Sequence, residues 1–90
     1  MDILHTIKTD NYKLIIENVE GNAFCHLQVY NWTASVYKQM LIELEQVKEA
    51  IGSTLWCSIR KDDEFKIKLV GMFGFLGAYE SDTAYIMEAV

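Results

Sequence analysis

A single long apolar stripe lies in the middle of this 90-residue chain, between two regions that have the shorter period of β-strands. Within residues 33–51 the apolar side chains recur every three or four positions, at Val36, Met40, Leu44, Val47 and Ile51. This spacing places them on one face of an α-helix. Asn31 or Thr33 can cap its start, and Gly52 can end it.

Branched and aromatic residues before this helix are typical of β-strands. Residues 12–19 and 23–30 are predicted to be strands, and Glu20-Gly21-Asn22 between them has the composition of a tight hairpin turn. After the helix, residues 54–60 are predicted to form a third strand. Because a helix joins residues 23–30 to residues 54–60, these two strands are expected to lie roughly parallel.

A second, shorter helix is predicted to begin after Asp62 or Asp63, either of which can cap it, and to run to about residue 73. Its inward-facing side chains are expected to be Phe65, Leu69 and Phe73 or Met72. Gly71 should weaken this helix by up to about 1 kcal/mol relative to alanine, unless close packing requires it.

A second hairpin is predicted from residues 75–80 and 83–89, around Ser81-Asp82. The fold class is therefore α+β. It contains a mixed, mainly antiparallel sheet of about five strands with two helices, in the order β-β-α-β-α-β-β. Residues 1–90 are predicted to be a single domain, made of an N-terminal segment (1–10) and a core (11–90).

Composition excludes several classes of protein. The apolar content of 51% is enough for a packed core, but no apolar run reaches the roughly 18 residues that cross a bilayer. The N-terminus is acidic and lacks an apolar signal core, so we expect a cytoplasmic protein. A net charge of −5 argues against direct binding to nucleic acid, which needs clustered lysine and arginine.

The two cysteines, Cys25 and Cys57, fall within predicted strands. We expect them to be reduced thiols packed in the core. The chain has no Cys-x-x-Cys pair and no histidine or cysteine at ligand spacing, so no metal site is expected.

The segment from Phe65 to Phe75, which ends in Gly74-Phe75, is the most specific local pattern in the chain. Together with the order strand, long helix, strand, short helix and hairpin over residues 12–89, it resembles the C-terminal half of GCN5-related N-acetyltransferases, the GNAT family. The resemblance implies a GNAT-like fold of the small, non-catalytic type found among bacteriophage proteins. Such a protein would work in the host cytoplasm or in the virion.

In the GNAT family the loop before the long helix carries an Arg/Gln-x-x-Gly-x-Gly/Ala pattern, whose backbone amides hold the coenzyme A pyrophosphate. The matching residues 30–35 contain no glycine and no basic residue, and Trp32 stands where room is needed. No cofactor is therefore expected. If acetyl-CoA does bind, the resemblance implies that Trp32, Thr33 and Ser35 lie against it.

The family's usual general acid is a tyrosine four residues before the glycine of Gly-Phe. Here that position is Val70, which cannot donate a proton. The asparagine common at the start of the same helix corresponds to Asp63, which can serve as a cap. We therefore predict no catalytic residue; Glu17 or His26 could supply another base, but their spacing selects neither.

Three functions remain open at this point. The first is a non-catalytic GNAT-like protein that binds another protein, as a virion component or as an inhibitor of a host factor. Its candidate partner surface is Trp32, Tyr37 and Trp56, and residues 83–89 could form a sheet edge that pairs with a second copy. The second is a minimal acetyl-CoA-dependent N-acetyltransferase with a divergent cofactor loop.

The third function is an acidic decoy that blocks a nucleic-acid-binding site. It would use two acidic groups, Asp62-Asp63-Glu64 and the set Glu43, Glu45 and Glu49. Such a decoy needs its carboxylates gathered on one surface.

Overall fold

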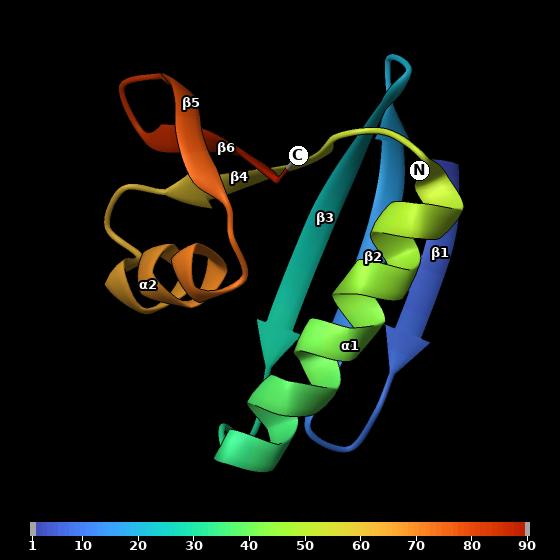
Figure 1. The fold of residues 1–90 in the computed structure, drawn as a ribbon. Coiled ribbons are helices and arrows are strands. Elements are labelled where there is room, and N and C mark those ends of the chain that lie inside the picture. Colours follow the sequence, from blue (N-terminus) through green and yellow to red (C-terminus); the bar gives the residue numbers. More distant parts are fainter. Residues whose placement is uncertain (1, 90) are drawn as a thin grey trace.

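The computed structural model describes residues 2–89, which form one six-stranded sheet with two helices (Figure 1). In chain order the elements are β1 (Asp2–Lys8), β2 (Tyr12–Val19), β3 (Asn22–Val29), α1 (Ala34–Ile51), β4 (Leu55–Arg60), α2 (Glu64–Met72), β5 (Leu76–Glu80) and β6 (Ala84–Ala89). The order of strands across the sheet is β1-β2-β3-β4-β6-β5. All neighbours pair antiparallel except β3 and β4, which are parallel. The predicted α+β class with two helices is confirmed.

Both helices pack on the same face of the sheet. The alternate residues that point to this face form one buried cluster with the inner sides of α1 and α2. The strands contribute most of its members: Tyr12, Leu14, Ile16, Ala23, Cys25, Leu55, Cys57, Ile59, Met87 and Ala89. The opposite face of the sheet carries neither helix, and we call it the open face.

The sheet has one strand more than predicted. Residues 2–8 fall in the predicted N-terminal segment, but they form β1 and pair with β2. Of this strand, Ile7 packs against the core and the other side chains are exposed. Since backbone pairing rather than side-chain burial holds β1, the alternation that reveals a strand in a sequence is weak there.

The predicted position of the C-terminal sheet edge is wrong. Residues 84–89 form β6, which lies between β4 and β5 and pairs with both. The edge is instead β5, which is exposed at every position, whereas β6 buries Met87 and Ala89. Because β6, the strand with the apolar face, lies inside the sheet, a homodimer cannot pair through it. That the chain forms a homodimer stays a prediction.

Helix α1 confirms its predicted face and its predicted ends. Its buried residues are Val36, Met40, Leu44 and Val47. Thr33 is the N-cap, and its hydroxyl oxygen accepts a hydrogen bond from the Val36 N–H at 3.2 Å. At the other end Gly52 adopts the left-handed conformation. No helix within residues 2–89 is long and apolar enough to cross a membrane.

Helix α2 begins as predicted, and two of its predicted inward residues, Leu69 and Phe73, are buried. Asp63 caps it by accepting a hydrogen bond from the Lys66 N–H. Leu69, Val70 and Phe73 are buried, whereas Phe65 and Met72 are each about half exposed. The expectation that Phe65 faces inward was wrong, because this nine-residue helix docks through its last turn rather than along its length.

The end of α2 explains the Gly74-Phe75 pattern in physical terms. The Phe75 N–H donates to the Val70 carbonyl, and the Gly74 N–H donates to the Gly71 carbonyl, each at 3.1 Å. This is the Schellman arrangement, in which the residue after the cap is left-handed and the next residue is apolar. Gly74 has φ of +88°, and Phe75 is buried in the same core as Val70.

The two glycines at this helix end should therefore respond in opposite ways to alanine. Gly74→Ala is expected to lower the free energy of unfolding by about 1 kcal/mol, because a side chain disfavours the left-handed conformation. Gly71→Ala should raise it by up to about 1 kcal/mol, because Gly71 lies in the helix and nothing lies within 4 Å of an added Cβ. Urea unfolding measures both changes, and a stabilised Gly74→Ala variant would contradict the assignment.

Candidate functional site

The sheet opens where β3 and β4 diverge. The two strands pair only at Ala23 with Leu55 and at Phe24 with Trp56, and then they separate (Figure 1). Beyond Phe24, residues 25–29 of β3 keep β2 as a neighbour on one side and have no strand partner among the described residues on the other. An interior strand thus carries a free backbone edge over half its length.

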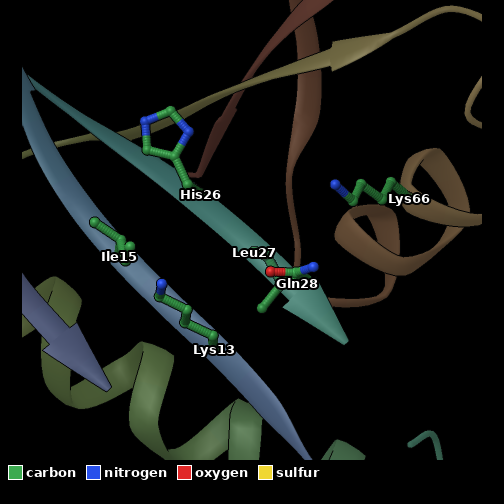
Figure 2. A pocket seen from close by; sticks show the side chains of 6 residues that line it. All are labelled: Lys13, Ile15, His26, Leu27, Gln28 and Lys66. Carbon is green, nitrogen blue, oxygen red and sulfur yellow. The ribbon is translucent and has the colours of Figure 1, made fainter. Parts of the chain in front are cut away.

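A cavity of about 260 Å³ lies along this part of β3, and we call it the β3 cleft. Figure 2 shows its lining residues on three elements: Lys13 and Ile15 of β2, His26, Leu27 and Gln28 of β3, and Lys66 of α2. Lys66 approaches from the far side of the gap between β3 and α2. The cleft therefore has β2 and β3 as one wall and α2 as the other.

The structure brings together the two alternative bases named from the sequence. His26 Nε2 lies 2.7 Å from Glu17 Oε1, across the β2–β3 pair. The His26 side chain is 50% exposed, and Glu17 is largely covered. A carboxylate bonded to an imidazole at a cleft is an arrangement that can take up a proton. Strand register, which the spacing alone did not give, is what joins them.

Trp32, in the loop between β3 and α1, packs against an aromatic side chain of α1. The Trp32 ring meets the Tyr37 ring edge-on at 5.9 Å, and the Tyr37 ring stacks on Phe73 at 5.4 Å. We call these three residues the aromatic ladder; it joins the start of α1 to the end of α2. The Thr33 hydroxyl oxygen accepts the hydrogen bond of the Val36 N–H. This amide is one of those at the start of a helix that can otherwise bind an anion.

Val70 and Asp63 lie at the two positions of α2 that the family resemblance relates to catalysis. Neither carries a free reactive group. Val70 is 4% exposed, and its carbonyl accepts the hydrogen bond that ends α2. The Asp63 carboxylate is engaged in capping α2. Both residues thus serve packing and helix ends. Among residues 2–89 no three His, Cys, Asp or Glu side chains gather as a metal site would require.

The three residues of the predicted partner surface do not form one patch. Trp32 and Tyr37 belong to the aromatic ladder beside the helices. Trp56 instead points to the open face, where its ring stacks on Tyr79 at 6.1 Å. Tyr79 and Leu76, both more than two-thirds exposed, are neighbours that the sequence did not single out. Only the pairing of β5 with β6 and of β6 with β4 brings Tyr79 to Trp56.

Cys25 and Cys57 directly follow Phe24 and Trp56, the last two residues that pair between β3 and β4. Both cysteines are free and buried, as predicted. Burial raises the pKa of the Cys25 thiol and of the Cys57 thiol to about 12 in each case. The thiols are therefore neutral and unreactive at physiological pH. They belong to the core under the cleft rather than to its chemistry.

Glu43 of α1 is half-buried and binds the sheet. Its carboxylate accepts a hydrogen bond from the hydroxyl of Tyr12, a side chain with no exposed surface. Desolvation raises the pKa of Glu43 above its ordinary value, and the nearby His5 partly opposes this. Because the folded state holds the proton more tightly than the unfolded state, this residue's contribution to stability falls as the pH rises above about 4.5.

Glu43→Gln is expected to raise the urea midpoint at pH 7, because the amide keeps an acceptor for Tyr12 and removes a partly desolvated charge. The advantage over the parent chain should shrink toward pH 4, where the Glu43 carboxyl is itself protonated. Glu49→Gln, at an exposed position of the same helix, is the matched control. A Glu43→Gln variant that is less stable than the parent at pH 7 would contradict this account.

Of the comparisons with known proteins, the one with solved structures supports the fold. Neither the protein-family models nor the curated proteins contain a match. Two solved structures match 89% of this chain: the ribosomal-protein-S5-alanine acetyltransferase from Vibrio fischeri (TM-score 0.73, 8% identity) and a protein described as a GNAT-family acetyltransferase from Bordetella pertussis (TM-score 0.69, 11% identity). The chain spans just over half of their lengths, 54% and 57% respectively. At these identities the likeness shows a GNAT-like fold alone.

Proposed function

We propose that this chain is a non-catalytic GNAT-like protein that acts by binding another protein. In this proposal it is the small bacteriophage type, a virion component or an inhibitor of a host factor in the cytoplasm. The observation that carries the proposal is the aromatic ladder. Trp32 occupies the segment that matches the family's cofactor loop, residues 30–35, and Tyr37 of α1 ties it to Phe73 at the end of α2.

Exposed aromatic and aliphatic surface supports a binding role. Trp56, Tyr79 and Leu76 lie on the open face, where a sheet exposed to water normally presents polar residues. Tryptophan and tyrosine are also the residues enriched at the centres of protein interfaces.

Calorimetric titration with acetyl-CoA tests the non-catalytic part of the proposal. We expect no saturable heat up to about 1 mM, the weak end of specific affinities. Saturable binding in the micromolar range would overturn it. The residues that match the cofactor loop do not fit the ligand, because Trp32 is bulky and Thr33 covers one helix amide.

The second candidate function is acetyl transfer, and the Glu17–His26 pair is the observation that favours it. This pair could accept the proton of an amine substrate. If the chain acetylates an amine, His26→Gln and Glu17→Gln should each abolish turnover while leaving the fold intact. Turnover that survives both substitutions would remove this pair from the reaction.

The acidic decoy has less support. Its two acidic groups are divided between α1 and the start of α2, and three of the six carboxylates already have partners within the chain. Asp62 pairs with Arg60 at 2.9 Å, Asp63 caps α2, and Glu43 binds Tyr12.

A further inference from the structure

We infer that the β3 cleft receives an extended, acidic segment of the partner protein, which adds as a strand to the free edge of β3. This inference rests on the proposed function and names the chemistry of the partner. It draws on two independent features, the unpaired backbone of residues 25–29 and the charge around it.

The backbone edge sets the shape of the occupant. Residues 25–29 are extended and paired on one side only, so they present unpaired N–H and C=O groups toward the gap. Five extended residues span roughly 16 Å. A peptide strand can pair its own N–H and C=O groups with those of such an edge, and this pairing is the basis of recognition by strand addition.

Edges of this kind are normally blocked by a bulge, a proline or a pairing strand. The chain contains no proline, and the register shifts in the sheet lie between β1 and β2 and between β5 and β6. The pairing of β2 with β3 is regular throughout. The free part of β3 therefore has neither a bulge nor a proline to prevent a strand from pairing with it.

Charge selects an acidic occupant. Lys13 and Lys66 line the cleft, and Lys8 lies directly opposite Lys13 in the β1–β2 pair. Like charges at opposite positions repel one another. The ion pairs within residues 2–89 are made by His26, Lys48, Arg60 and Lys61, so these three lysines have no carboxylate partner there. Three of the eight basic residues of an acidic chain thus gather at one place.

The remaining lining suits alternate side chains of an added strand. Ile15 and Leu27 give the cleft apolar surface, while Gln28 and the Glu17-bound His26 offer hydrogen-bonding groups. Successive residues of an added strand point to opposite sides. An acidic residue can therefore reach Lys13 or Lys66 while its neighbour contacts an apolar side chain.

The test is a selection of random dodecapeptides, displayed on a library, against the intact chain. We expect the enriched peptides to be rich in Asp and Glu, and the best of them to protect the amides of residues 25–29 from hydrogen exchange. Methylating alternate backbone nitrogens of that peptide, on its pairing edge, should abolish binding because it removes the strand hydrogen bonds. Raising the salt concentration should weaken binding.

Charge-reversal variants locate the site. Lys13→Glu combined with Lys66→Glu should weaken the selected peptide at least tenfold. Lys38→Glu combined with Lys68→Glu makes the same change in net charge on the two helices and should leave the affinity within about twofold. Enrichment of neutral or basic peptides, protection on β5 and β6 instead of β3, or no enrichment would each overturn the inference.

These outcomes separate the inference from the proposed function. If acetyl-CoA binds in the micromolar range, the non-catalytic function fails whatever the peptides do. If neither acetyl-CoA nor any peptide binds, the strand-addition inference fails alone, and the open face around Trp56 remains for a partner.

Discussion

Replacing Tyr37 with alanine is expected to lower the free energy of unfolding by about 2–3 kcal/mol, in the lower part of the range for aromatic truncations. Tyr37 is the middle of the aromatic ladder: its ring touches both Trp32 and Phe73, and it packs against the core. A chain of this size is stable by only about 5–13 kcal/mol, so the loss is a large fraction of the total. The melting temperature should fall by roughly 10–20 °C.

Two milder variants test whether the stacking is responsible. Tyr37→Phe keeps the ring and removes only the hydroxyl, whose bond to the Met72 carbonyl is long at 3.4 Å, so it should change stability by less than about 0.5 kcal/mol. Trp32→Ala removes the outer, edge-on contact and should cost about 1 kcal/mol. If Tyr37→Ala cost no more than Trp32→Ala, the ladder would not be joining α1 to α2.

A double-mutant cycle between Tyr37 and Phe73 measures the link itself. The two residues come from different helices and touch by stacking, so a coupling free energy of about 1 kcal/mol is expected. Tyr37 and Tyr79 lie on opposite faces of the sheet and should show additive effects. Coupling of equal size in both pairs would mean that the cycle reports a general loosening of the fold.

The elements that the sequence predicted well are those whose side-chain burial follows their own period. The stripe from Val36 to Ile51 and the alternation in residues 12–19 each report burial against one core. Strand β1 was missed because it is held mainly by its backbone, and Phe65 was misplaced because α2 packs by its end. In both cases the determining contact involves a partner element that periodicity does not register.

The site was predictable only in its parts. Glu17 and His26 were named as residues that could act as bases, but their 2.7 Å contact depends on the register of β2 against β3. The cleft depends on a pairing that stops after two residue pairs, and no sequence pattern marks where parallel strands diverge. That Lys13 of β2 and Lys66 of α2 line the same cleft likewise follows from tertiary structure.

Rebuilding residues 30–35 to the family's cofactor-loop pattern should create acetyl-CoA binding in a chain that we expect to have none. The variant combines Tyr30→Arg, Trp32→Ala, Thr33→Gly and Ser35→Gly, which restores the family pattern at residues 30–35. We expect the dissociation constant to fall from above about 1 mM to about 10 µM, a hundredfold gain worth about 2.7 kcal/mol. Calorimetry with acetyl-CoA measures it.

The gain is expected because each change frees or adds a group for the pyrophosphate. Removing the Thr33 hydroxyl releases the Val36 N–H, and glycine as a cap costs only a few tenths of a kcal/mol. The amides at the start of α1, together with the helix dipole and the new arginine, then face an anion without Trp32 in the way. Tyr30→Arg alone is the control, since it adds the charge and leaves the amides covered. If the folded four-residue variant binds no better than this control, the obstacle lies in the β3 cleft itself, and the aromatic ladder would lose its place as the observation on which the non-catalytic function rests.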